Sequence, residues 1–196
     1  MKKSRRRIVK MLPARVIDAA ARRYAEEGFN IPPALRKQVF DRFFTGRWRP
    51  EWETLLANRR LPLAKRLTRF YAEYRGNITR TGARLWTRAG LLGLQGPAFS
   101  RTLEKRILRP VVIELRHEAG FHGKRKISGA ELELVQMLHG AIAFPHTRSH
   151  IFDMDVYGKL PGLVAMMVRV WLPGAIAETR RLAKARRARS LTATRP

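Results

Sequence analysis

The chain has 196 residues, 45% of them hydrophobic, which is enough to bury the core of one large domain or two small ones. It carries 41 lysines and arginines against 15 acidic residues, a formal net charge of +26 at pH 7. A positive field of this size attracts polyanions, and nucleic acid is the commonest polyanion in a cell. The alternatives are a genome that favours arginine and a solvated surface with no binding role. Cysteine is absent, which excludes disulfides, zinc fingers and a thiol nucleophile.

The first predicted helix lies in VIDAAARRYAEEGF, residues 16–29. Val16, Ile17 and Tyr24 recur there at helical spacing, and Gly28 is well placed to end the helix.

Prolines introduce the next predicted helices. Pro32 and Pro33 precede a helix over ALRKQVFDRFF, residues 34–44, and Pro62 precedes another over LAKRLTRFYAEYR, residues 63–75. Between them, TGRWRPEWETLL is predicted to be a loop that leads into a short helix. Its tryptophans are expected to pack this helix onto the body, with stacking on exposed bases as the alternative.

Helices are also predicted in the second half of the chain, at residues 78–92, 98–117, 129–148 and 161–189. Pro110 is expected to kink the second of these, and Pro145 is expected to disturb the third. The last is expected to break near Pro173 and Gly174. No sustained two-residue alternation bounded by hairpin signals occurs. The predicted fold class is therefore all-α, a helical bundle.

Basic residues concentrate at the two ends of the chain. Residues 1–10 contain six basic side chains and no acid, and residues 180–196 contain seven basic side chains and no acid. This layout is typical of arms that contact phosphates on either side of a folded body, and the alternative is a pair of solvated tails. The predicted DNA contacts in the first arm are Lys2, Lys3, Arg5, Arg6 and Arg7.

Several stretches resemble the TetR/AcrR family of bacterial transcriptional regulators. VIDAAARRYAEEGF is similar to the first helix of the family, with an apolar residue, a pair of alanines, an aromatic residue, acidic residues and Gly-Phe. FFTGRW, residues 43–48, resembles the aromatic pair and the basic residue that end the recognition helix and begin the fourth helix. PLAKRLTRFYAEY, LEKRILRPVVIELRHEAG and ELELVQMLHGAIAFPHTR resemble the ligand-binding and dimerising half of such regulators.

The resemblance implies a DNA-binding transcriptional regulator, a repressor, that is a homodimer. A cytoplasmic location is expected separately, from the lack of a signal peptide and of an uninterrupted membrane-spanning run. Residues 1–57 would form the basic arm and the DNA-binding-like helices, residues 58–190 the ligand-binding and dimerisation domain, and residues 191–196 a tail. The helices at 129–148 and 161–177 would pack against their counterparts in a two-fold dimer. The body would hold a small apolar effector, and no cofactor is implied.

One segment is shorter than its counterpart in the family. Residues 30–42 number thirteen, which at about 1.5 Å per residue makes a single helix of about three turns, whereas a helix-turn-helix needs two helices. By the resemblance, Arg47 takes a position that contacts a backbone phosphate. The alternative for the basic residues is the exposed side of an amphipathic helix. The candidate DNA contacts in this region are Arg36, Lys37, Gln38, Arg42 and Arg47.

Pockets between the helices of a bundle are lined mainly by apolar and aromatic side chains. The candidates to line the effector pocket are Phe70, Tyr74, Leu85, Trp86, Leu92, Phe99, Met137, His139 and Phe144. His139 is a polar group on an otherwise apolar helix, so a hydrogen-bonded core histidine is the alternative.

Enzymatic and membrane functions are not expected. The sequence has no Gly-rich phosphate loop and no GxSxG elbow, and no HExxH pattern accompanies its histidines, so neither catalysis nor a metal is predicted. The N-terminus lacks the apolar segment of a signal peptide, and the apolar run at residues 163–177 is interrupted by Arg169 and Pro173. Two other functions stay open: a non-specific basic protein that binds DNA or RNA, and a dimerisation remnant that acts through protein partners.

Overall fold

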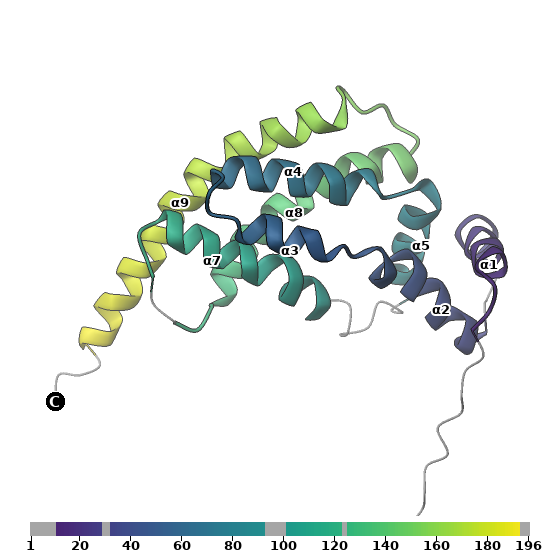
Figure 1. Cartoon of the computed structure of the whole chain (residues 1–196), viewed down its shortest axis with the longest axis horizontal. Helices are drawn as coiled ribbons and strands as arrows, with labels where there is room; N and C mark the ends of the chain where they lie inside the picture. The colour runs from purple at the N-terminus through teal and green to yellow at the C-terminus, as the bar shows by residue number, and fades with distance from the viewer. Residues whose placement is uncertain (1–10, 29–31, 93–100, 123–124, 193–196) are drawn as a thin grey trace, which may run out of the picture. The chain divides into compact units, whose positions relative to one another are not determined.

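The computed structural model describes residues 11–28, 32–92, 101–122 and 125–192. Every regular element within these ranges is a helix, which confirms the predicted all-α class (Figure 1).

The chain divides into two compact units, each of which is discontinuous in sequence. Unit 1 contains residues 1–48 and 79–94, and unit 2 contains residues 49–78 and 95–196. This division differs from the predicted boundary at residue 57. The reason is physical: a helix far along the chain supplies part of the core of unit 1, and the pattern of a single sequence does not show which helices pack together.

Unit 1 is built around three of the described helices, α1 (Ala14–Glu27), α2 (Pro33–Phe43) and α5 (Arg80–Leu91), with the short 3-10 turn η1 (Thr45–Arg47) after α2. α1 packs against both α2 and α5. The single helix α2 confirms the expectation from the length of its segment. The buried apolar side chains of the unit form one cluster: Ile17, Ala21, Tyr24, Ala25, Val39 and Leu85.

Gly28 closes the C-terminus of α1, as predicted. It adopts a φ of 72°, in the left-handed region that favours glycine at the end of a helix. A Cβ at this position would lie 2.3 Å from Nη1 of Arg88 on α5. The same nitrogen donates to the carbonyl oxygen of Tyr24 at 3.2 Å. Glycine at position 28 therefore allows a side chain of α5 to cap the last turn of α1.

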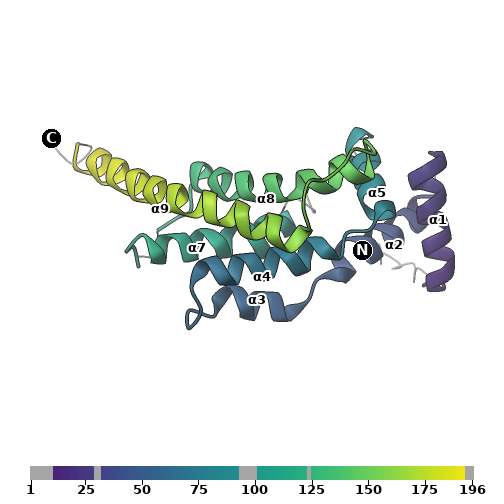
Figure 2. The ribbon, with the colours of Figure 1, turned by 90° about the horizontal axis from the view of Figure 1, so that it is seen from above.

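Unit 2 contains the elements α3 (Pro50–Ala57), α4 (Leu63–Gly76), η2 (Glu104–Leu108), α7 (Arg109–Glu118), α8 (Gly129–His150) and α9 (Leu160–Thr192). α4 packs on α3 and α9, and α7 packs on α3, α8 and α9. Figures 1 and 2 show α9 lying along α4 and α8, with its last turns running past the other helices of the unit. Trp52 of α3 is buried in this bundle, as expected for a tryptophan that packs a short helix onto the body.

A buried ion pair connects α4 to α7 inside unit 2. The carboxylate of Glu114 on α7 accepts from Arg66 of α4 at 2.6 Å and from Arg59, before α4, at 2.9 Å. Arg66 is only 1% exposed and also donates to the carbonyl oxygen of Leu61 at 3.0 Å. Burial would raise the pKa of Glu114, but the hydrogen bonds from Arg59 and Arg66 outweigh it and lower this pKa. Both charges are therefore paired, which buried ions require.

The prolines of unit 2 interrupt its helices less than predicted. Pro110 lies in the first turn of α7, and the five-residue π segment η2 directly precedes this helix, so the helical pitch changes next to the proline. Pro145 lies inside the continuous α8, and Pro173 lies inside the continuous α9. The predicted break near Pro173 is therefore wrong, because one proline removes one N–H donor and the flanking turns of a long helix persist.

The apolar run of α9 is consequently longer than predicted. The stretch Leu160–Arg186, with a mean hydropathy of 1.6 in its most apolar window, is long and apolar enough to cross a membrane, and 17% of that window is buried within the protein. A single helix of this kind is weak evidence for a membrane span, because the core helix of a soluble protein meets the same criterion. The cytoplasmic location stays a prediction.

Candidate nucleic-acid interface

Half of the predicted DNA contacts lie in the N-terminal arm. Lys2, Lys3, Arg5, Arg6 and Arg7 all fall outside the described residues, so their predicted role stays a prediction. The other five candidates lie on α2 and η1 in unit 1.

Arg36, Lys37 and Gln38 do not form an exposed reading face on α2. Gln38 is buried, and its carboxamide oxygen accepts from the backbone N–H of Leu12 at 2.9 Å. The Nε of Arg36 is enclosed and has no hydrogen-bond partner among the described residues. Lys37 is exposed and pairs with Asp41 one turn later. The side-chain amide of Gln38 is thus used inside unit 1, which corrects the prediction that Gln38 contacts DNA.

Arg42 and Arg47, in contrast, lie together at one hollow of about 470 Å³ in unit 1, which we call the α5 hollow. Its described lining residues come from α1, the end of α2, η1 and the start of α5: Asp18, Arg22, Arg42, Phe43, Gly46, Arg47, Thr79 and Thr81. Three positive side chains thus face a single negative one.

The charges of the α5 hollow are partly paired. Arg42 holds Asp18 through two hydrogen bonds, Nε to Oδ1 at 2.5 Å and Nη2 to Oδ2 at 2.8 Å. These hydrogen bonds lower the pKa of Asp18, so its carboxylate is ionised at neutral pH. The guanidinium of Arg47 lies over the ring of Phe43, 5.0 Å from its centroid. Burial and the charge of Arg42 lower the pKa of Arg47. An anion in the hollow would relieve the repulsion between Arg42 and Arg47.

The N-terminus of α5 borders the same hollow. Thr79 caps the helix, and its hydroxyl accepts from the N–H of Gly82 at 3.2 Å. Thr81 also lines the hollow. The N-terminal end of a helix carries a partial positive charge and free N–H groups, both of which favour a phosphate.

Sequence reasoning missed Arg22, Thr79 and Thr81. A threonine three residues before Gly82 at the start of an amphipathic run is a recognisable cap signal. The sequence contains no sign that this cap lies beside α2, because about thirty-five residues separate them along the chain.

Three of the predicted effector contacts do gather in the core of unit 2. The ring centroid of Trp52 lies 5.9 Å from that of Phe70 and 5.5 Å from that of Tyr74, and His139 lies 5.9 Å from both Tyr71 and Tyr74. Phe70 and Tyr71 are completely buried. Burial lowers the pKa of His139 to about 4, so its ring is neutral at neutral pH. These side chains pack as a core. However, Nδ1 of His139 is buried and has no hydrogen-bond partner among the described residues, so this side chain does not match the hydrogen-bonded core histidine of the alternative interpretation.

The remaining effector candidates are dispersed. Leu85 and Trp86 lie in unit 1, and Trp86 packs edge-on against Phe44 at 5.4 Å between ring centroids. Leu92, Met137 and Phe144 are exposed. Phe99 lies outside the described residues. None of the three hollows named for the described residues is lined by any of the nine candidates, and the effector pocket stays a prediction.

Met137 and Phe144 belong instead to exposed apolar stripes on α8 and α9, which pack against each other. On α8, Gly140 and Ala141 lie on the same exposed face, between Met137 and Phe144. On α9, Met166 and Val170 are 43% and 75% exposed, and the stripe continues through Pro173, Gly174 and Ala177.

The histidines near the end of α8 are engaged within unit 2. Nε2 of His146 lies 2.7 Å from the carbonyl oxygen of Arg75, and its ring lies 5.5 Å from that of His150. Within the part of the chain that the structure describes, no group of three or more histidine and carboxylate side chains could hold a metal ion.

Comparison with protein-family models, with curated proteins and with solved structures finds no match to this chain. The resemblance to TetR/AcrR regulators therefore stays a prediction.

Proposed function

We propose that this protein binds double-stranded DNA mainly through the phosphate backbone and largely without regard to sequence. The observation that carries the proposal is the α5 hollow, where Arg22, Arg42 and Arg47 lie beside the N-terminal end of a helix. Arginine forks and helix N-termini are the groups that hold phosphates in protein–DNA complexes. The net charge of +26 would concentrate DNA near this surface.

Base reading receives less support from the same unit. Side chains that pair with base edges must reach the major groove. On α2, the amide of Gln38 is buried and committed to Leu12, and Arg36 is half-buried. Phosphate contacts position a protein on a duplex but do not specify its sequence. The sequence-specific repressor expected from the family resemblance is the second candidate, and a selection experiment separates the two.

We also propose that the protein is a homodimer through the exposed stripes of α8 and α9. Exposed apolar side chains recur on α8 from Met137 to Phe144 and on α9 from Met166 to Val170. Two adjacent helices that each expose an apolar stripe can be covered by the same two helices of a second copy, which forms a four-helix, two-fold interface.

Salt-dependent binding of fluorescent duplexes tests the proposal. We expect the dissociation constant to be similar for duplexes of unrelated sequence and to rise steeply with salt, because each neutralised phosphate releases counterions. In the double variant Arg42→Gln/Arg47→Gln, two phosphate contacts are lost, so the slope of log K against log salt should decrease in magnitude by about two.

The matched control is Lys65→Gln/Lys159→Gln, which removes two exposed charges from unit 2 and should keep the slope. Equal loss of slope in both double variants would show that the hollow makes no particular contact. Enrichment of one defined sequence from a random duplex pool would favour the sequence-specific regulator instead.

A further inference from the structure

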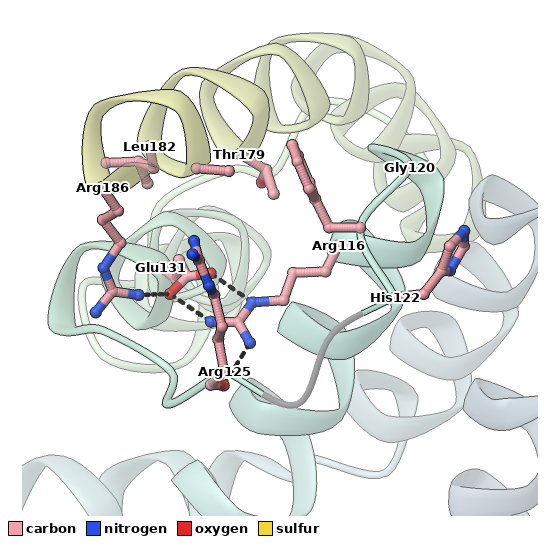
Figure 3. A pocket seen from close by; sticks show the side chains of 10 residues that line it. Arg116, Gly120, His122, Arg125, Glu131, Thr179, Leu182 and Arg186 are labelled. Atoms are coloured by element: carbon pink, nitrogen blue, oxygen red, sulfur yellow. Dashed lines mark hydrogen bonds and ion pairs between the residues drawn. The ribbon is translucent and has the colours of Figure 1, made fainter. Parts of the chain in front are cut away.

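Unit 2 contains a second basic site, made of two adjoining hollows of about 140 and 440 Å³ that we call the basic basin. The two hollows share Arg116, Phe121, His122 and Arg125. The described residues that line only the larger one are Arg59, Arg109, Ile113, His117, Lys126 and Ile127. The smaller hollow lies between α7, the start of α8 and α9 (Figure 3).

The floor of the basin is held in place by Glu131. Its carboxylate accepts from Arg116 at 2.6 and 2.9 Å and from the N–H and hydroxyl of Ser128 at 2.8 and 2.7 Å, and Nη1 of Arg186 lies 3.5 Å away. Figure 3 shows the guanidinium groups of Arg116 and Arg186 both pointing at this carboxylate. Arg116 also donates to the carbonyl oxygen of Arg125 at 2.7 Å. Glu131 therefore orients Arg116, which in turn holds the backbone of Arg125 and Lys126, the two residues that form the rim of the basin.

The rim keeps an excess of positive charge after this pairing. The side chains of Arg125 and Lys126 are exposed. Arg116 bonds to these two residues through their backbone carbonyl oxygens and not through their side chains. Arg59 is paired with Glu114, which it shares with Arg66, and Arg109 is paired with Glu104. None of the described residues that line the larger hollow is acidic. An anion that enters it meets cations from the segment before α4, from α7 and from the segment before α8.

The same hollow has an apolar wall. Ile113 is 49% exposed although it lies on α7 at the edge of a packed bundle, and Phe121 and Ile127 line the hollow beside it. The imidazole rings of His117 and His122 meet edge to face at 5.1 Å between centroids and add hydrogen-bonding nitrogens. A cavity of this size, part apolar and part cationic, has the volume that small-molecule sites commonly have.

We propose that the basic basin binds an organic phosphate of about the size of a mononucleotide. The phosphates would contact Arg125, Lys126 and the free N–H groups of Arg59, because arginine forks match phosphate oxygens in pairs. The apolar part of the ligand would lie on Ile113 and Phe121. This site is independent of the α5 hollow, since all of its residues belong to unit 2.

Calorimetric titration of the full chain with ADP, adenosine and inorganic phosphate tests this inference. We expect ADP to bind with one site per chain, and adenosine and inorganic phosphate to bind at least about tenfold more weakly, because each supplies only half of the contacts. Arg125→Gln/Lys126→Gln should weaken ADP binding about tenfold or more, since two charge-assisted contacts are lost while both backbone carbonyls remain.

Three further variants make the result specific. Lys65→Gln/Lys159→Gln removes the same charge at two exposed positions that do not line the basin, so this control should bind ADP as the wild type does. Ile113→Glu puts a carboxylate on the wall at an exposed position, which should abolish ADP binding while the thermal unfolding midpoint stays close to that of the wild type. Arg42→Gln/Arg47→Gln, in unit 1, should leave ADP binding unchanged.

Three results would overturn the inference. One is an equal loss of ADP affinity in the rim variant and the control, which would mean attraction by net charge alone. Another is equal affinity for ADP and inorganic phosphate, which would remove the role of the apolar wall. The third is complete displacement of ADP by a short DNA duplex from both the wild type and Arg42→Gln/Arg47→Gln, which would assign the basin to the DNA-binding surface.

Discussion

Asp18 shows how one acidic side chain tunes the α5 hollow. It is the only acid among the described residues that line the hollow, and it holds Arg42 in a bidentate ion pair. A phosphate that approaches Arg42 has to compete with this carboxylate and is also repelled by it. The same pair positions the guanidinium, so Asp18 lowers the affinity for DNA while it orders the site.

Replacing this carboxylate should therefore strengthen DNA binding. In Asp18→Asn, we expect the dissociation constant for a duplex to fall about threefold at low salt, and the gain to shrink as salt screens the charges. The measurement is fluorescence anisotropy across a salt series. The sign is opposite to that expected for Arg42→Gln. If Asp18→Asn bound DNA more weakly than the wild type, the ordering of Arg42 by Asp18 would outweigh the repulsion.

At the level of elements, Glu131 connects three helices of unit 2. It lies in the first turn of α8, where with Ser128 it forms a capping box, and it pairs with Arg116 of α7 and Arg186 of α9. Burial would raise the pKa of Glu131, but the hydrogen bonds from Arg116 and Ser128 outweigh burial and lower this pKa to about 2. The charged form of Glu131 therefore stabilises the packing of α7, α8 and α9.

The linkage to pH follows from the direction of this shift. A carboxylate whose pKa is lowered by folding contributes stability above its ordinary pKa of 4.5, and this stability is lost as pH falls from about 4.5 to about 2. At about 1.4 kcal/mol for each pH unit, Glu131→Gln should lower the free energy of unfolding by about 3 kcal/mol at neutral pH. The difference from the wild type should disappear near pH 2.

Chemical denaturation at a series of pH values measures this effect. The matched control is Glu133→Gln, an exposed position on the same helix, which should change the free energy of unfolding by no more than about 0.5 kcal/mol. A pH-independent difference between wild type and Glu131→Gln would show that packing, and not the charge, accounts for the loss.

The helices themselves could be predicted from the sequence. Apolar residues at helical spacing in α1 and α4, Gly28 after α1 and the prolines before α2 and α4 mark elements that local interactions largely determine. Pro173 was misleading, because the cost of one proline inside a helix of 33 residues is offset by packing of the flanking turns on α4 and α8, which the sequence does not show.

The candidate site could be predicted only in part. Arg42 and Arg47 were found because they lie near each other in the chain. Arg22 and Thr79 were not, because tertiary packing of α5 on α1 brings them to the same hollow. Gln38 has the side chain of a base reader, but it satisfies the backbone N–H of Leu12. Residue type alone cannot distinguish these two uses of an amide.

For the whole molecule, the exposed stripes on α8 and α9 predict an oligomer. Met166→Glu/Val170→Glu places two charges in the proposed interface, where they would be buried without partners, so we expect the dimer to dissociate to a monomer. Size-exclusion chromatography with light scattering measures the mass. The matched control, Met11→Glu/Leu91→Glu, changes two exposed apolar residues of unit 1 and should stay dimeric.

A monomeric wild type would contradict the dimer. Co-flotation of the wild type with anionic lipid vesicles, lost in Met166→Glu/Val170→Glu and kept in the control, would assign the stripe on α9 to a membrane surface instead, as the apolar character of Leu160–Arg186 allows.

The interleaving of the two units has a consequence for synthesis on the ribosome. The core of unit 1 needs Leu85, so α1 and α2 cannot be completed until α5 has emerged, by which time α3 and α4 of unit 2 are already outside the exit tunnel. Those two helices must then wait, with Trp52 and Phe70 uncovered, for α9 to be translated. A nascent chain stalled before residue 160 should thus carry a folded unit 1 together with an incomplete, aggregation-prone unit 2. The order in which the helices are translated therefore determines which apolar surfaces stay exposed during synthesis.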